Sequence, residues 1–158
     1  MKIAVLGDSH GQTKNIDWAM ESIATKGVDY IIHTGDNFDD MRYIVESSDI
    51  KTIGVRGNYD TQPEGKDELL EILGEKKLFV THGHRYGVKY GLEKIFYRGK
   101  ELEADIVIFG HSHVPHYSIE EEMILLNPGS ISIPRGNSSR CYAIIIIDED
   151  VSVEFVEL

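Results

Sequence analysis

The chain has 158 residues, 41% hydrophobic and 27% charged, a composition that argues against long disordered segments and fits one domain over residues 1–158. Its formal net charge of −11 argues against the broad basic surface that binds nucleic acid. With Cys141 as its only cysteine, the chain can form neither an internal disulfide nor a thiolate metal cluster.

The first residues enter an apolar run at once. They leave no room for the charged region, apolar region and cleavage site of a signal peptide. No run approaches the roughly 20 apolar residues that span a bilayer. We therefore expect a cytoplasmic protein without a membrane partner.

Six short apolar runs each end abruptly in polar or glycine-rich sequence. Because they are short, rich in β-branched residues and bounded by glycine, they predict buried strands. The runs are 3–6, 30–32, 52–55, 78–80, 106–109 and 124–126.

Between the first three runs, the apolar spacing changes to that of a helix. Residues 16–23 carry apolar side chains three and four positions apart, with Gly27 as a stop, and residues 41–45 carry a weaker stripe. Alternating strands and helices predict a mostly parallel sheet with ligands beyond the carboxyl ends of its strands. The histidine-bearing clusters all follow such ends.

The rest of the chain is expected to be mainly strand. Residues 69–73 and 77–80 predict a hairpin, and residues 92–102 an amphipathic helical stretch. Strands are predicted at 117–120, 123–126, 141–147 and 151–156, and we expect these four in a second sheet packed on the first.

Three polar pairs stand two residues apart: Asp8 with His10, His82 with His84, and His111 with His113. In an extended segment such residues point to one side, so each pair could aim two ligands into one cavity. Imidazole and carboxylate together suit manganese, iron, nickel or zinc, and the shortage of oxygen ligands argues against calcium.

Seven side chains are candidate ligands and catalytic groups. They are Asp8, His10, Asp36, Asn58, His82, His111 and His113. One ion rarely takes so many imidazoles, whereas two ions sharing a bridging carboxylate would. Paired metals about 3.5–4 Å apart are the usual arrangement for displacement at phosphorus, which makes phosphate-ester hydrolysis the leading hypothesis. Peptide or amide hydrolysis also uses paired metals.

Five ordered motifs resemble the calcineurin-like metallophosphoesterases, specifically their small prokaryotic phosphodiesterase branch. They are Gly7-Asp8-Ser9-His10, Gly35-Asp36, Gly57-Asn58-Tyr59-Asp60, His82-Gly83-His84 and Gly110-His111-Ser112-His113. The resemblance covers residues 2 to about 135, and Asn127-Pro128-Gly129-Ser130 resembles a further element of the branch.

The resemblance implies a fold, a ligand set and an activity. The fold is a four-layer α/β/β/α sandwich of two mixed sheets flanked by helices. Asp8, His10, Asp36 and His113 would hold one ion, and Asp36, Asn58, His82 and His111 the other, with Asp36 bridging. A bridging hydroxide would attack phosphorus in a small phosphodiester. The two divalent ions are most often Mn²⁺, Ni²⁺ or Fe²⁺, with Zn²⁺ as a further candidate, and a homodimer or homotetramer is suggested by resemblance alone.

Two other functions are compatible with this resemblance. The small subunit of the retromer coat is similar to this branch and serves as a non-catalytic protein-interaction module, and DNA-repair relatives are nucleases. Retention of Asp8, His10, Asp36 and Asn58 favours the enzyme over the module. The acidic balance and the short chain weigh against the nuclease.

One residue departs from the family pattern. Many members carry histidine after the motif asparagine, where it is thought to protonate the leaving group, but this chain has Tyr59. Because losing a general acid can cost roughly 10²–10⁴ in rate, we expect activated aryl phosphodiesters to be better substrates than alkyl esters.

Other polar residues near the motifs have a structural or a functional interpretation. His33 falls inside a strand run and is predicted to be a buried, hydrogen-bonded histidine. His84 would contact substrate or orient a ligand imidazole, and Asp60 would orient a catalytic group or close a turn. The arginines Arg85, Arg98 and Arg135 are candidates to hold phosphate oxygens, or are simply exposed.

Overall fold

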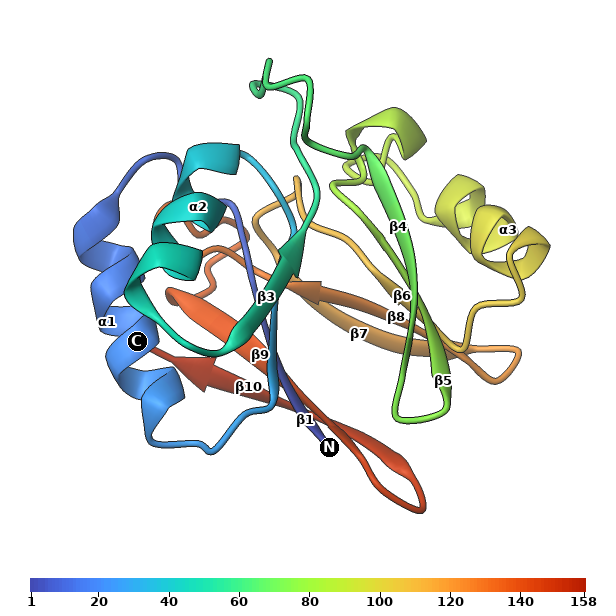
Figure 1. Ribbon diagram of the computed structural model, residues 1–158. Helices are drawn as coiled ribbons and strands as arrows, with labels where there is room; N and C mark the ends of the chain where they lie inside the picture. Colours follow the sequence, from blue (N-terminus) through green and yellow to red (C-terminus); the bar gives the residue numbers. More distant parts are fainter.

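The computed structural model describes residues 1–158 as two five-stranded sheets packed face to face, with helices on both outer faces (Figure 1). The first sheet has the order β10 (Val151–Glu157), β9 (Cys141–Ile147), β1 (Lys2–Leu6), β2 (Tyr30–His33) and β3 (Lys51–Gly54). The second has the order β4 (Glu68–Leu73), β5 (Lys76–Thr81), β6 (Ile106–Ile108), β8 (Met123–Pro128) and β7 (Pro115–Glu120).

Three helices complete the four layers. The helices α1 (Thr13–Ala24) and α2 (Phe38–Ser47) lie on the outer side of the first sheet, and α3 (Glu93–Glu101) lies on the outer side of the second (Figure 1). A short 3-10 helix, η1 (His84–Tyr86), follows β5. The predicted α/β/β/α sandwich of two mixed sheets is therefore confirmed.

Three apolar layers hold the sandwich together. Because side chains alternate along a strand, Val5 on β1 faces the second sheet while Leu6 faces the helices. The layer between the sheets includes Ile145 and Leu126, and the layer beneath α3 includes Phe79. Strands covered on both faces explain the unbroken apolar runs in the sequence.

The parallel strands determine where the polar clusters meet. In the first sheet β1, β2 and β3 run parallel, and in the second β5, β6 and β8 do. The carboxyl ends of parallel strands lie at one edge of each sheet, so the loops that follow them gather there. The six predicted runs, the hairpin and the three helical stretches all appear at the expected places.

The expected placement of the last strands is wrong for β9 and β10. β7 and β8 do join the second sheet, but β9 pairs antiparallel with β1 and carries β10 at the edge of the first sheet. The physical reason is burial of both faces of β9: Ile145 packs between the sheets, and Tyr142 and Ile144 pack beneath α1 and α2. Such a strand needs an interior position in its sheet.

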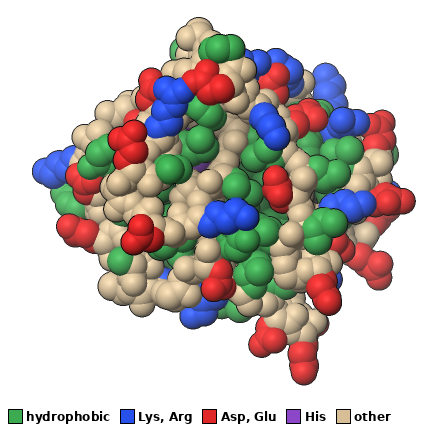
Figure 2. All heavy atoms as spheres, in the orientation of Figure 1, with side chains coloured by type: hydrophobic (Ala, Val, Ile, Leu, Met, Phe, Trp, Pro, Cys, Tyr) green, Lys and Arg blue, Asp and Glu red, His purple; other side chains and the backbone are tan.

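The surface agrees with the acidic composition. Figure 2 shows one face of the molecule, on which Lys and Arg side chains are scattered among Asp and Glu and form no continuous basic area. That face lacks the electrostatic footprint of a nucleic-acid groove. None of the helices combines the length and the apolar character needed to cross a membrane.

Candidate metal centre

The loops at the carboxyl ends of four strands bring possible ligand atoms into two groups. The first group contains Asp8, His10, Asp36 and His113, and the second contains Asp36, His82 and His111. Within each group the ligand atoms lie within 4.8 Å of one another, and Asp36 belongs to both. The structure thus brings together all the sequence-predicted site residues except Asn58.

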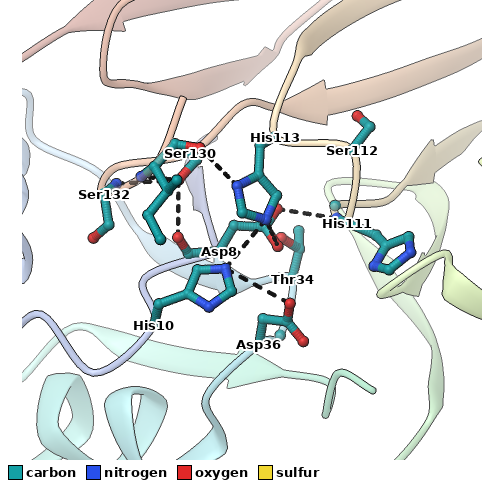
Figure 3. Close-up of polar contacts among 12 residues, drawn as sticks. Asp8, His10, Thr34, Asp36, His111, Ser112, His113, Ser130 and Ser132 are labelled. Atoms are coloured by element: carbon teal, nitrogen blue, oxygen red, sulfur yellow. Dashed lines mark hydrogen bonds and ion pairs between the residues drawn. The ribbon is translucent and has the colours of Figure 1, made fainter. Parts of the chain in front are cut away.

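In the first group the side chains point toward one another, as the close-up shows (Figure 3). His10 Nε2 lies 3.1 Å from His113 Nε2 and 3.7 Å from Asp36 Oδ2. His113 Nε2 lies 3.4 Å from Asp8 Oδ1. Asp8, His10 and Asp36 come from the first sheet, and His113 comes from the second.

In the second group His82 is the central side chain. Its Nε2 lies 3.2 Å from Asp36 Oδ1 and 3.1 Å from His111 Nδ1. The ring of His111 lies apart from the first group, on the other side of the loop that carries His113 (Figure 3). The two histidines of one motif therefore serve different groups.

Backbone carbonyl oxygens fix which nitrogen of each buried imidazole carries the proton. His82 Nδ1 lies 2.8 Å from the carbonyl oxygen of Thr34, and His113 Nδ1 lies 2.7 Å from that of Ile133. A carbonyl can only accept, so in both rings Nδ1 is the donor and the neutral ring presents a lone pair at Nε2. Such a partner is the usual support of a metal-ligating histidine.

Lone pairs therefore face lone pairs inside both groups. Asp8 Oδ1 and Asp36 Oδ1 are buried and have no hydrogen-bond partner. Each lies within 3.4 Å of the Nε2 of a histidine whose proton is held at Nδ1. Acceptors that meet out of water are unfavourable unless a cation or a proton lies between them. The residues present thus fit a pair of divalent ions.

A second set of contacts holds Asp8 and the loop from Gly110 to His113. The Oδ2 of Asp8 accepts a hydrogen bond from the His111 backbone N–H at 3.0 Å. The hydroxyl of Ser130 donates to the carbonyl of Asp8 at 2.8 Å, and the amide of Asn127 donates to the carbonyl of Gly110 at 2.9 Å. The last two contacts come from Ser130 and Asn127 in the motif at residues 127–130, and the sequence did not reveal this role.

The backbone at the site is strained, and it is not extended as the two-residue spacing suggested. Asp8, His10, Asp36, His111 and His113 all have φ between 51° and 67°. This left-handed region costs a non-glycine residue of the order of 1–3 kcal/mol. The expectation that these pairs point one way because they are extended is wrong: each side chain is aimed by its own turn.

Burial and neighbouring charge shift the pKa values of the carboxyls in opposite directions. Burial raises the pKa of Asp8 to about 7, against the lowering effect of His82. Burial also acts to raise the pKa of Asp36, but His82 in its protonated form, which would donate from Nε2 and carry a positive charge, outweighs burial, so the pKa of Asp36 lies below its ordinary value. Asp36 is therefore ionised at neutral pH.

The imidazoles of the second group also differ. Burial alone would lower the pKa of His82, but Asp36 and Asp8 raise it above its ordinary value. Burial and the charge of His82 lower the pKa of His111 to about 4. In the metal-free protein a second proton on His82 thus takes the position of a cation, and metal binding would displace that proton.

Asn58 is exposed in the turn that follows β3, and the turn is fixed against the site by its neighbours. Asp60 accepts hydrogen bonds from the backbone N–H groups of Gly57 at 2.6 Å and Phe38 at 2.9 Å, so it closes the turn and joins it to the start of α2. A Cβ at Gly57 would lie 2.2 Å from Asp36 Oδ1, so glycine is required there. Asn58 directly follows Gly57 in the chain, and Gly57 packs closely against Asp36.

His33 and His84 occupy different environments. His33 is fully buried, its Nε2 lies 3.0 Å from Ser9 Oγ, and its Nδ1 accepts from the Gly35 N–H at 3.2 Å, which confirms a hydrogen-bonded core histidine. The ring of His84 lies 5.4 Å from that of His82 and belongs to neither group. Its Nδ1 is buried without a partner.

The arginines divide into paired and unpaired side chains. Arg85 pairs with Asp67 at 2.8 Å, and Arg98 pairs with Glu101 at 3.0 Å. Arg135 is exposed, has no carboxylate partner, and donates its backbone N–H to the carbonyl of His113 at 3.0 Å. Of the three, Arg135 is the one whose guanidinium is free to meet an anion.

Comparisons with known proteins find relatives that cover most of the chain. Residues 1–150 match the sequence model of the calcineurin-like phosphoesterase superfamily domain. The probable metallophosphoesterase YsnB of Bacillus subtilis is 36% identical over 96% of this chain and 88% of its own. Phosphodiesterase YfcE of Escherichia coli is 27% identical over 96% and 89%. A crystal structure of a predicted phosphoesterase from Streptococcus pneumoniae, 32% identical, covers 99% of this chain and 88% of its own with a TM-score of 0.82.

The double membership of Asp36 leads to a prediction about metal content. We expect Asp36→Asn to lose both ions together, because one carboxylate contacts both groups. Metal analysis of the purified variant measures this, with Asp49→Asn as the control because Asp49 is exposed and makes no ion pair. Retention of two ions by the Asp36 variant would show that the carboxylate is not shared.

The raised pKa of Asp8 leads to a prediction about pH. The folded protein keeps the Asp8 proton up to about pH 7, whereas the unfolded chain releases it near pH 3.8, so metal-free stability falls as pH rises through that window. In chelator, we therefore expect Asp8→Asn to be a few kcal/mol more stable than wild type at pH 8. The difference should close near pH 4. Urea unfolding at both pH values measures it, and an equal difference at both would contradict the shift.

Proposed function

This chain belongs to the calcineurin-like phosphoesterase superfamily, and from that premise we propose that it is a dinuclear metal-dependent phosphodiesterase. The observation that supports two ions is the sharing of Asp36 between two groups of ligand atoms. A mononuclear site would leave one group of facing lone pairs without a cation. The bacterial relatives named metallophosphoesterase and phosphodiesterase support the reaction class.

The proposed ligands divide as the two groups do. Asp8, His10, Asp36 and His113 would hold one ion, and Asp36, His82 and His111 would hold the other. By the family resemblance, the amide oxygen of Asn58 would complete the second set. Two divalent ions, when bound, would lower the pKa of a water and neutralise charge on the phosphoryl oxygens. The donor set suits Mn²⁺, Ni²⁺, Fe²⁺ or Zn²⁺.

The protein's own residues would hold and orient the reacting groups. The carbonyls of Thr34 and Ile133 keep the imidazoles of His82 and His113 in one tautomer and one direction. The exposed Arg135, whose backbone N–H donates to the carbonyl of His113, would bind a phosphoryl oxygen through its guanidinium. The imidazole that would protonate the leaving group in many relatives is replaced here by the phenol of Tyr59.

The features of the site favour an enzyme over a non-catalytic interaction module. A module would need neither buried carboxylate oxygens without partners nor five ligand positions with left-handed backbone. The net charge of −11 and the scattered basic side chains favour a small substrate over nucleic acid (Figure 2).

Chelation and metal restoration test the function. We expect protein freed of metal to be inactive and to recover hydrolysis of phosphodiesters, in preference to phosphomonoesters, when Mn²⁺, Ni²⁺, Fe²⁺ or Zn²⁺ is restored. Full activity should require two ions per chain, measured by titration against turnover. Full activity at one ion per chain, or preference for monoesters, would overturn the proposal.

Tyr59 leads to a prediction about leaving groups. Because the phenol replaces the imidazole that many relatives have there, we expect turnover of aryl phosphodiesters to exceed that of alkyl diesters by about 10²-fold or more. Tyr59→His should narrow this gap by raising turnover of the alkyl ester. Measured kcat for a matched pair of esters decides it, and equal turnover by wild type, with chemistry rate-limiting, would contradict the assignment.

A further inference from the structure

A cavity opens beside the first ligand group, with a volume of about 280 Å³. It is lined by His10, Asp36, Asn37, Tyr59, Asp60 and Gln62. Since two of these residues belong to the ligand groups, whatever enters this cavity lies next to a phosphorus atom bound at the metals. The properties of its walls therefore bear on the organic part of the substrate.

The polar side chains of this cavity are already engaged. The amide oxygen of Asn37 accepts from the Asp39 N–H at 3.2 Å, and Asp60 accepts from the N–H groups that close its turn. Gln62 uses both ends of its amide: the oxygen accepts from the Thr61 N–H at 3.0 Å and the nitrogen donates to Asp39 at 3.1 Å. Among these three side chains, only the amide nitrogen of Asn37 makes no hydrogen bond within the protein.

Tyr59 differs from all of them. Its side chain is 77% exposed, and its hydroxyl makes no hydrogen bond. Its ring lies edge-on to the ring of His10, with centroids 6.4 Å apart and planes at 63°. The turn beneath it is fixed, because the Asp60 N–H donates to the Gly57 carbonyl at 3.3 Å while the Asp60 carboxylate accepts from the Gly57 N–H. The chain thus presents an open aromatic face at a fixed place beside the ligand group.

We propose that Tyr59 is a stacking surface for a planar aromatic group of the substrate, so that this phosphodiesterase acts on nucleoside phosphodiesters. The inference rests on the proposed function and adds the substrate class to it. A tyrosine ring is suited to this because only two torsions are ordered when it stacks. Because every base has an aromatic face and stacking does not read the edge of a base, the site should accept all bases.

A matched pair of ligands isolates the contribution of the base. Adenosine 5′-monophosphate and ribose 5-phosphate carry the same phosphate and sugar, and only the first has a base. Stacking of a base on an aromatic side chain increases affinity by about 5- to 150-fold. We therefore expect metal-loaded wild type to bind adenosine 5′-monophosphate at least fivefold more tightly than ribose 5-phosphate in titration calorimetry.

Variants assign this difference to the ring. Tyr59→Phe keeps the aromatic face and should keep the difference, whereas Tyr59→Ala should make the two ligands bind equally. Tyr90→Ala is the matched control, because Tyr90 is 96% exposed and lies outside the cavity. Metal content and circular dichroism of each variant show whether it folds as wild type does.

The outcomes separate this inference from the proposed function. If ribose 5-phosphate binds and adenosine 5′-monophosphate binds no more tightly, stacking is overturned while the phosphate site stands. If neither ligand binds the metal-loaded protein, the stacking inference is overturned, while the proposed function is still judged by the turnover of phosphodiesters. If one base is preferred to another of the same ring size by more than tenfold, the base is read by its edge, which overturns recognition by stacking alone.

Discussion

The site depends on an unfavourable contact between hydrogen-bond acceptors, namely carboxylate oxygens and imidazole nitrogens. Asp8 and Asp36 each place one carboxylate oxygen, out of water, against the unprotonated nitrogen of an imidazole whose own proton is committed to a backbone carbonyl. Left alone, such groups repel one another and must take up protons. The pKa values of His82 and Asp8 are both raised, which shows that the site favours bound protons. The site is thus complete only with positive charge inside it.

The sandwich supplies the rigidity that this meeting requires. Apolar residues on both faces of β1 and β2 fix the starting points of the loops that carry Asp8 and Asp36. Five candidate ligands then adopt left-handed backbone, which persists only where the surroundings determine it strongly. Contacts from Ser130 and Asn127 do this for the loops on either side. The regular strands therefore stabilise irregular turns, and the turns aim the side chains.

Much of this could be predicted from the sequence, and the failures have physical causes. Short apolar runs identify buried strands because burial of both faces needs no alternation, but the same signal cannot say which sheet a strand joins, and β9 and β10 were misplaced for that reason. The residue types and their order predicted which side chains would gather, whereas their division into two groups was implied only by the family resemblance. The spacing of His111 and His113 did not reveal that they separate into two groups, because their left-handed turns are set by tertiary contacts. The carbonyls of Thr34 and Ile133 are backbone atoms, so no residue type could signal them.

Each of the two groups draws side chains from both sheets. Asp8, His10 and Asp36 follow strands of the first sheet, whereas His82, His111 and His113 follow strands of the second. Each ion, once bound, would act as a cross-link between the halves of the sandwich at the edge where the loops gather. The halves could then neither slide nor spread at that edge without breaking coordination bonds. Loading with metal would therefore determine the mechanical stiffness of the molecule as well as its chemistry.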